Sequence, residues 1–346
     1  MRVVPMVAAV AVMATGLSLG GDVSRRDVAR NPAVTFLVAD ASLGYAQEMA
    51  MGFEAGAAEV PGVESSERAS AVGDTTTQLA TARDVLDEGR TGVSLFTWNP
   101  ELLAPAGGPR VIAVHTPPAL GSGIRLYIGN DDYRLGQMLG EQLATMIPFG
   151  MRGTIVLGTS VPGALELDRR GAGVRDWLNR VRPRLNILGP FDTKQDPAAS
   201  QEAWTTLLRA NPYAVAFVGL GDNDAATLAR LRASSGGGWL AGGFGLDDMA
   251  LAAVRTGGFA LVSPELYVQG AVAGRLQAAA ARGDALPEGW LVTPGKPIRA
   301  ADVPAIRSWQ ASAGTRAVWA RKIVDDLVTN APAHLRPLED VQGSLS

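Results

Sequence analysis

Short apolar runs alternate with amphipathic segments along most of the chain. Residues 34–39 (VTFLVA) are apolar, rich in β-branched side chains and bounded by a proline and an aspartate, which predicts a buried strand. A helical pattern follows at 45–59, and the runs at 92–98 and 110–115 have the length and composition of further strands. Strands of this kind that alternate with helices are typical of a parallel sheet covered by helices on both faces.

The same alternation begins again after residue 130. Helices are expected at 133–147, 163–181, 197–210 and 265–282, and strands at 154–158, 213–219, 239–245 and 259–262. Two successive sets of similar length predict an α/β protein with two similar lobes. The last segment, 301–346, contains five basic and five acidic residues and is expected to form one or two surface helices with a frayed end.

Several polar residues stand where helices are expected to begin. Asp196 precedes a proline at the first helical position, which is a strong start signal. Thr75 and Gln78 have the spacing of a capping box, and Asp132 can cap the next lobe's first helix. Either Asp222 or Asn223 can cap the helix before 239, so a polar side chain there has a structural explanation available.

The N-terminal segment has the layout of a secretory signal. Arg2 is followed by an apolar run without a charge until Asp22, which predicts a signal peptide at 1–21 and a polar linker at 22–32. An uncleaved membrane anchor is the alternative, because the run approaches the length that spans a bilayer. Export to the periplasm is expected, without lipid attachment, because the chain has no Cys to acylate.

Composition excludes several classes of function. The 346 residues are 47% hydrophobic and 19% charged, which suits two globular domains and argues against disorder. A net charge of −3 argues against a nucleic-acid partner. With no Cys and only His115 and His334, thiolate chemistry and multi-His metal sites are excluded, so we expect no metal and no cofactor. The glycine runs at 219–221 and 242–245 do not complete a dinucleotide-binding loop.

Candidate ligand contacts follow the predicted strands, at the edge where open α/β sheets bind ligands. Tyr45 and Trp98 could stack on a sugar ring or pack in the core. His115 could contact a ligand or lie at the surface, and Asp222 could bind a ligand or cap a helix. Arg169 and Arg170 are adjacent and point in different directions, so one could face a cleft while the other is solvated.

The order of several motifs resembles a known family. FLVAD-x4-Y-x6-GFEAGAAE is followed by IGNDDYRLG, DRRGAG, GLGDND and GGFG. This layout, over about residues 33–296, resembles the periplasmic sugar-binding proteins of ABC importers, of the ribose/galactose type. The resemblance implies the type I periplasmic binding protein fold, in which three hinge strands join two lobes around a monosaccharide. It implies a first lobe at 33–129 plus 265–290, a second at 130–264 plus 291–300, and a tail at 301–346.

The resemblance also implies roles for individual residues. Tyr45 falls on the family's stacking aromatic, Arg170 on its ligand-binding arginine and Asp222 on a position usually held by asparagine. His115 falls on an acidic position. Gly245 stands where the family has a sugar-binding aspartate, which leaves Asp247 as the nearest replacement, and Pro264 occupies a frequent glutamine position. The departures at His115 and Gly245 remove two acceptors, so an acidic or less hydroxylated ligand is also expected.

The expected function is that of a solute receptor that binds a sugar or polyol and does not change it chemically. Its partner would be a membrane ABC permease, and the receptor itself would be a monomer. A sensory module for a chemotaxis or kinase receptor is the first alternative. An exported α/β hydrolase is the second, although the sequence contains no G-x-S-x-G elbow. A DNA-binding regulator is disfavoured, because an export signal stands where a helix-turn-helix is expected.

Overall fold

The computed structural model describes residues 31–69, 75–88, 91–97 and 110–342. The expected signal peptide at 1–21, nearly all of the linker at 22–32, and Trp98 lie outside the described residues and stay predictions. From residue 31 onward the described chain belongs to one compact unit that contains two sheets.

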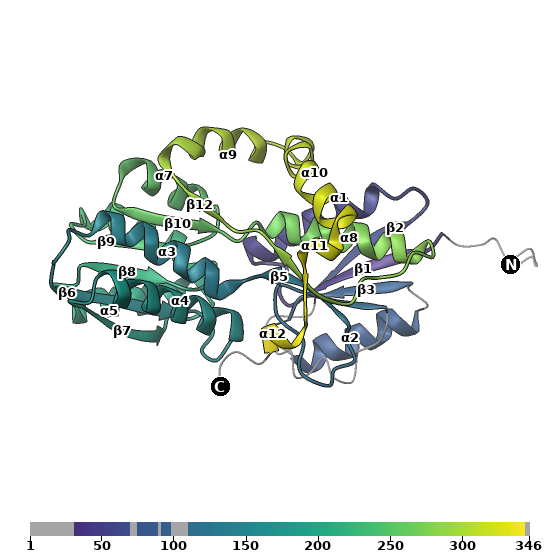
Figure 1. The fold of residues 1–346 in the computed structure, drawn as a ribbon, viewed down its shortest axis with the longest axis horizontal. Helices are drawn as coiled ribbons and strands as arrows, with labels where there is room; N and C mark the ends of the chain where they lie inside the picture. Colours follow the sequence, from purple (N-terminus) through teal and green to yellow (C-terminus); the bar gives the residue numbers. More distant parts are fainter. Residues whose placement is uncertain (1–30, 70–74, 89–90, 98–109, 343–346) are drawn as a thin grey trace, which may run out of the picture. The chain divides into compact units, whose positions relative to one another are not determined.

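The first sheet has seven strands in the order β13-β11-β5-β4-β3-β1-β2 (Figure 1). Neighbours pair in parallel, except that β13 is antiparallel to β11. The strands are β1 (Ala33–Val38), β2 (Glu64–Ala69), β3 (Gly92–Leu95), β4 (Val111–Val114), β5 (Leu126–Asn130), β11 (Gly289–Thr293) and β13 (Leu335–Arg336). Helices α1 (Gly44–Ala58) and α8 (Leu266–Ala281) cover one face, and α2 (Thr75–Asp87) packs on the other.

The second sheet has six strands in the order β12-β10-β9-β8-β6-β7, parallel except for β12. They are β6 (Gly153–Thr159), β7 (Leu185–Asp192), β8 (Ala216–Gly219), β9 (Leu240–Phe244), β10 (Phe259–Ser263) and β12 (Lys296–Ile298). One face packs on α3 (Asp132–Met146) and α4 (Leu165–Val181). The other packs on α5 (Pro197–Ala210), α6 (Asp224–Ser235) and α7 (Asp248–Thr256).

Three crossings join the two sheets before residue 299. The chain passes from β5 to α3 after Asn130, from β10 to α8 after Ser263, and from β11 to β12 through Pro294. The expected α/β fold with two lobes is therefore confirmed. One expected boundary differs: β11 pairs with β5 as far as Thr293, so 291–293 belong to the first lobe rather than the second.

The C-terminal segment is built into both lobes and is not a surface tail. It consists of a 3₁₀ turn (Ala300–Asp302) followed by α9 (Val303–Gln310), α10 (Ala313–Thr329), α11 (Ala331–His334), β13 and α12 (Glu339–Gln342). Val303 and Ile306 belong to the second lobe's core, whereas Val324 and Leu327 belong to the first lobe's. The sequence does not show this, because apolar residues at helical spacing do not name the surface that they cover.

Two of the predicted helix caps differ in the structure. Asp196 caps α5 as expected, accepting a hydrogen bond from the backbone N–H of Ala199. The cap of α3 is Asp131 rather than Asp132, whose carboxylate instead pairs with Arg170. Gln78 does not close a capping box, because its side chain donates to the carbonyl of Phe96 and accepts from a threonine on the same strand end.

Glycines allow one helix pair in each lobe to pack backbone against backbone. In the first lobe, Gly52 and Gly56 of α1 face Gly270 and Gly274 of α8. A Cβ atom at Gly270 would lie 1.9 Å from the carbonyl oxygen of Met49, which is too close for any contact. In the second lobe, Gly136 of α3 meets the backbone of α4 in the same way. The position of α1, and with it Tyr45, depends on this close approach.

Gly270→Ala is therefore expected to destabilise the protein by about 3 kcal/mol, because the helices must move apart to admit the methyl group. The matched control is Gly314→Ala in α10, where an added Cβ would meet nothing closer than 3.9 Å. That change should leave stability unchanged or raise it by up to about 1 kcal/mol. Denaturant unfolding measures both variants, and equal effects would show that α1 and α8 can adjust freely.

Candidate functional site

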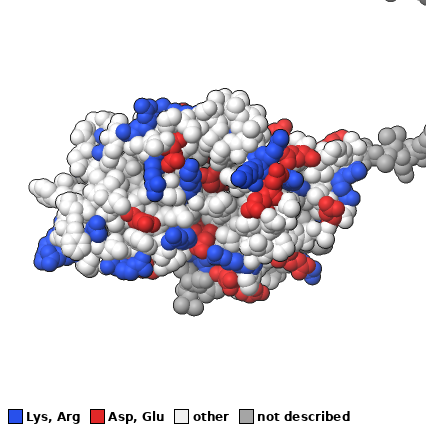
Figure 2. Space-filling view, turned by 45° about the horizontal axis from the view of Figure 1, so that its top comes forward, with Lys and Arg blue, Asp and Glu red and all other residues white. Residues whose placement is uncertain are grey.

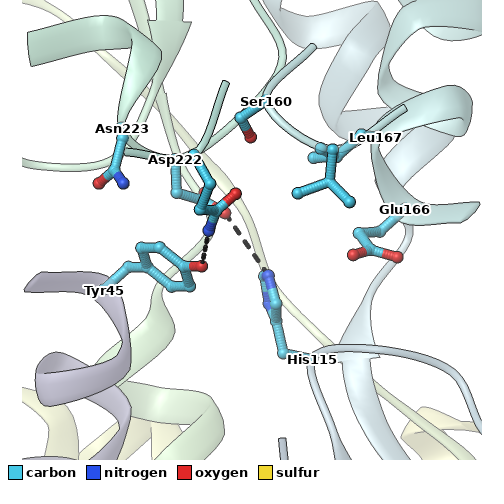
Figure 3. A pocket seen from close by; sticks show the side chains of 9 residues that line it. Tyr45, His115, Ser160, Glu166, Leu167, Asp222 and Asn223 are labelled. Carbon is cyan, nitrogen blue, oxygen red and sulfur yellow. Dashed lines mark hydrogen bonds and ion pairs between the residues drawn. The ribbon is translucent and has the colours of Figure 1, made fainter. Parts of the chain in front are cut away.

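A pocket lies between the two lobes at the carboxyl ends of their parallel strands (Figure 3). The first lobe contributes side chains at the start of α1 and after β4, and the second contributes side chains near the starts of α4, α5 and α6. The residues lining it are Tyr45, His115, Ser160, Val161, Glu166, Leu167, Gln195, Asp222 and Asn223.

The two lobes touch directly across this pocket. The Nε2 amide group of Gln195 donates to the hydroxyl of Tyr45, and Nε2 of His115 lies 3.5 Å from Oδ2 of Asp222. The cavity that remains is about 10 Å³, which is room for about one water molecule. A larger ligand therefore requires the lobes to separate and these two contacts to break.

Arg170 of α4 is the centre of a buried ion-pair network. Its side chain has no exposed surface. Nε donates to Oδ1 of Asp132 at 2.8 Å, while Nη1 donates to Oδ1 of Asp222 at 3.0 Å and to the carbonyl of Leu220 at 3.0 Å. The guanidinium also lies over the ring of Phe244, 4.6 Å from its centroid. These contacts tie α4 to the start of α3 and to the loop between β8 and α6.

The network holds Asp222 in its charged form. Burial favours the neutral carboxyl, but the adjacent Arg170 and His115 outweigh that effect and lower the pKa of Asp222 to about 2. The opposite holds for Asp132, whose pKa is raised because burial outweighs its pairing with Arg170. A carboxylate that stays ionised while fully enclosed is a strong hydrogen-bond acceptor for any donor that enters the cleft.

His115 is oriented by a hydrogen-bond chain that leads to the hinge. Its Nδ1 lies 3.3 Å from Oε1 of Gln269, whose Nε2 group donates to Oδ1 of Asn130 and to the carbonyl of Pro264. Because Gln269 presents its oxygen to the ring, Nδ1 carries the proton. Burial lowers the pKa of His115, but its hydrogen bond and charge interaction with Asp222 more than compensate, so the pKa is raised.

The same chain joins all three crossings between the lobes. The amide nitrogen of Asn130, at the first crossing, donates to the carbonyls of Thr293 and Pro294 at the third. The carbonyl of Pro264, at the second, accepts from Gln269. The backbone at His115 has a positive φ of 68°, a conformation that costs free energy for a residue with a side chain. Its ring is thus fixed both by its backbone and by the hinge.

Glu166 and Gln195 carry buried oxygens that have no hydrogen-bond partner in the described part of the chain, namely Oε2 of Glu166 and Oε1 of Gln195. Burial raises the pKa of Glu166 to about 7. In Figure 3 the Glu166 carboxyl group lies beside His115 and across from Tyr45. Both oxygens can accept hydrogen bonds from a ligand, and leaving them unpaired costs free energy.

The structure brings together three of the predicted site residues, Tyr45, His115 and Asp222. Arg170 lies behind the pocket, next to Asp222 rather than among the lining residues. Asp247 is exposed and caps α7 by accepting from the N–H of Met249, so the structure gives it a capping role away from the pocket lining. No side chain replaces the acceptor at Gly245, which itself has a φ of +105°.

Arg169 also differs from the expectation that it is solvated. It is buried, and its Nη2 donates to the carbonyl of Asp340 at the C-terminal end of the described chain. A segment 171 residues away covers it, which local sequence cannot reveal.

Sequence analysis missed Glu166, Gln195 and Ser160. Each precedes or begins a helix of the second lobe, so their position after a strand was the available signal. The helix start at Asp196 was recognised without attention to its neighbour Gln195.

Within the described residues, no group of three or more His, Asp or Glu side chains has the arrangement of a metal site. None of the described helices combines the length and apolarity needed to cross a membrane. Basic and acidic side chains are interspersed on the described part of the face in Figure 2, and no extended basic surface suited to a nucleic-acid backbone covers it.

Comparison with known proteins places this architecture. A family model described as a periplasmic binding protein domain matches residues 34–285. No curated protein sequence matches the chain.

Solved structures share the fold at low sequence identity. A solute-binding protein of an ABC transporter from Agrobacterium radiobacter, in complex with D-arabinose, has a TM-score of 0.71 and 20% identity, with 80% of this chain and 98% of that chain covered. One from Burkholderia graminis C4D1M, also with D-arabinose, has a TM-score of 0.70 and 18% identity over 79% and 97%. One from Bacillus halodurans C-125, with myo-inositol, has 0.70 and 16% over 80% and 98%.

Arg170→Ala is expected to lower the free energy of unfolding by about 3–5 kcal/mol, because it leaves Asp132 and Asp222 buried without their cation. Arg134→Ala on the exposed side of α3 is the control and should change it by less than about 0.5 kcal/mol. Urea unfolding of both variants checks this. Similar stabilities would mean that the carboxylates find other partners and that Arg170 does not hold the second lobe together.

Proposed function

Because the chain belongs to the periplasmic binding protein family, we propose that it is the solute receptor of an ABC importer and binds a sugar or related polyol between its lobes. The solved structures with the same fold include proteins of ABC transporters with bound D-arabinose and myo-inositol. The family binds ligands and does not transform them, so the proposed activity is reversible binding. A membrane permease is the proposed partner, and the receptor is proposed to act as a monomer.

The observation that carries this proposal is the set of buried polar groups that meet in the cleft from both lobes. Oε2 of Glu166 and Oε1 of Gln195 await donors, and Nη2 of Arg170 is a buried donor without an acceptor among the described residues. A ligand hydroxyl group both donates and accepts, so a polyhydroxylated molecule can satisfy all three groups.

The charge balance of the cleft favours a neutral ligand. The guanidinium of Arg170 is already paired with two carboxylates, so it does not offer a free positive charge to an acidic ligand. Glu166 adds a third carboxyl group to the same region. This makes the acidic ligand considered from the sequence less suitable than a neutral polyol.

In the proposed complex, Tyr45 forms an aromatic wall with Phe96 and His115. The ring centroids of Tyr45 and Phe96 are 5.8 Å apart, and those of Phe96 and His115 are 5.5 Å apart. The C–H face of a sugar can pack on such a wall while its hydroxyl groups reach Asp222, Glu166 and Gln195. Trp98 is a second stacking candidate from the sequence.

Ligand entry follows from the direct contacts between the lobes. A pyranose ring cannot occupy a cavity of about 10 Å³, so the hinge must open and His115 must part from Asp222. On closure the ligand would take the place of these contacts and bridge the same side chains. Binding is therefore proposed to be an exchange of interlobe contacts for ligand contacts.

A thermal-shift screen of pentoses, hexoses and inositols is expected to identify at least one compound that raises the melting temperature and is recovered unchanged. Calorimetry should show that Glu166→Gln weakens binding of that compound by about 1–3 kcal/mol, because a charged acceptor is lost. The control is Glu141→Gln, an exposed residue of α3. Chemical conversion of the compound would contradict the proposal.

The pH dependence of binding gives a second readout of the same prediction. A donor from the ligand favours the ionised form of Glu166, so affinity should rise with pH through its pKa of about 7 and then level off. Glu166→Gln should flatten this rise, whereas Glu141→Gln should keep it. An identical pH profile in all three proteins would show that Glu166 does not touch the ligand.

Export is proposed from the N-terminal pattern together with the family, whose members are periplasmic. N-terminal sequencing of protein from the cell envelope should find a first residue close to positions 20–30 and no attached lipid, because the chain has no Cys. Recovery of the chain from the cytoplasm with Met1 in place would contradict both the signal peptide and the periplasmic receptor.

A further inference from the structure

The C-terminal segment crosses between the lobes a fourth time, beyond the residues that the family model matches (Figure 1). Its first part is anchored to the second lobe. Val303 and Ile306 of α9 are buried among residues from α6, α7 and β10, and the side chain of Gln310 donates to the carbonyl of Leu246 after β9. Helix α9 therefore moves with the second lobe.

The next helix is anchored to the first lobe. Val324 and Leu327 of α10 are buried in the cluster that includes α1 and α8. Oε1 of Glu59, at the end of α1, lies 3.5 Å from Nε of Arg321, and Arg275 of α8 pairs with Asp325. Helix α10 therefore moves with the first lobe.

The elbow between α9 and α10 is short and rigid. Ser312 caps α10 by accepting from the N–H of Thr315, whose hydroxyl donates to the carbonyl of Trp309 at 2.9 Å. The rings of Trp309 and Trp319 stack with centroids 4.0 Å apart and planes 8° apart. Trp309 packs against the second lobe's core and Trp319 against the first, so this stack joins the lobes.

The elbow lies close to the cleft. Nη1 of Arg316 is 3.9 Å from Oε1 of Glu48, which is one helical turn after Tyr45 on α1. On the other side, Leu246 follows β9 at the edge of the sheet where the ligand-facing loops emerge. The elbow thus connects the rims of the two lobes in addition to the three crossings at the hinge.

The end of the segment makes a second connection. Arg336 of β13 donates to Oδ2 of Asp131 at the first crossing, and Arg169 of the second lobe donates to the carbonyl of Asp340. Val341 is buried in the first lobe beside Trp290. One segment therefore contacts both lobes at two separate places.

We propose that residues 299–342 form a strap that limits how far the two lobes can open. Opening beyond the reach of the elbow requires either that the Trp309–Trp319 stack separates or that α9 leaves the second lobe's core. The strap narrows the range of ligand-free conformations and so keeps the lobes close to the bound arrangement, which lowers the conformational cost of binding. This property does not depend on which ligand the cleft accepts.

The absence of Cys in the chain allows a direct test. Spin labels are attached to Glu54→Cys on α1 and Glu202→Cys on α5, two exposed positions in different lobes, and distances are measured by pulsed electron paramagnetic resonance on the ligand-free protein. A six-residue Gly-Ser insertion between Ala311 and Ser312 adds up to about 20 Å of reach while leaving both helices intact. It should add a population at longer distance that the unmodified protein lacks.

The control carries the same insertion between Gly283 and Asp284, in a turn that stays within the first lobe, and should keep the original distances. Trp309→Ala breaks the stack without lengthening the chain, should broaden the distances less, and serves if the insertion variant does not fold. Unchanged distances in a folded insertion variant would overturn the strap. Because no ligand is present, this result is independent of the screen that tests sugar binding.

Discussion

A fully buried guanidinium held between two buried carboxylates organises the second lobe and its cleft. Arg170 joins α4 to the start of α3 through Asp132 and to the loop before α6 through Asp222. Separating any one of these charges from the others would leave it unpaired in a dry interior, which costs several kcal/mol. Asp222 is consequently both ionised and fixed in direction, and it faces His115 of the other lobe. The arginine thus supports the ligand surface from behind.

The relation between cleft and hinge follows from this arrangement. His115 meets Asp222 on one side and Gln269 on the other, and Gln269 bonds to Asn130 at the first crossing. A change in what His115 contacts in the cleft therefore changes the strength of a chain that ends at the hinge backbone. Such buried polar chains are effective only when each member has a partner, which is why a ligand that restores the lost contacts favours closure.

The C-terminal segment adds a mechanical constraint to this electrostatic one. Three crossings define where the lobes rotate, whereas the elbow at Trp309 and Trp319 lies nearer the cleft. The segment buries apolar residues in both lobes, so its attachment is part of each core. A receptor built in this way holds its binding surfaces close together before the ligand arrives, at the expense of how widely the cleft can open.

The sequence by itself determined the α/β class, the two lobes and several elements, because apolar periodicity and the start signal at Asp196 are local. It also pointed to Tyr45, His115 and Asp222, because parallel strands bring the residues that follow them to one edge. It missed β2, whose residues ESSERA are polar because it is a half-exposed edge strand. Only the tertiary structure decided that Arg170 is an internal support, that Glu166 faces the cleft and that the C-terminal helices join the lobes. Each depends on a partner distant in the chain, and local pattern carries no information about which distant surface will exclude water from a side chain.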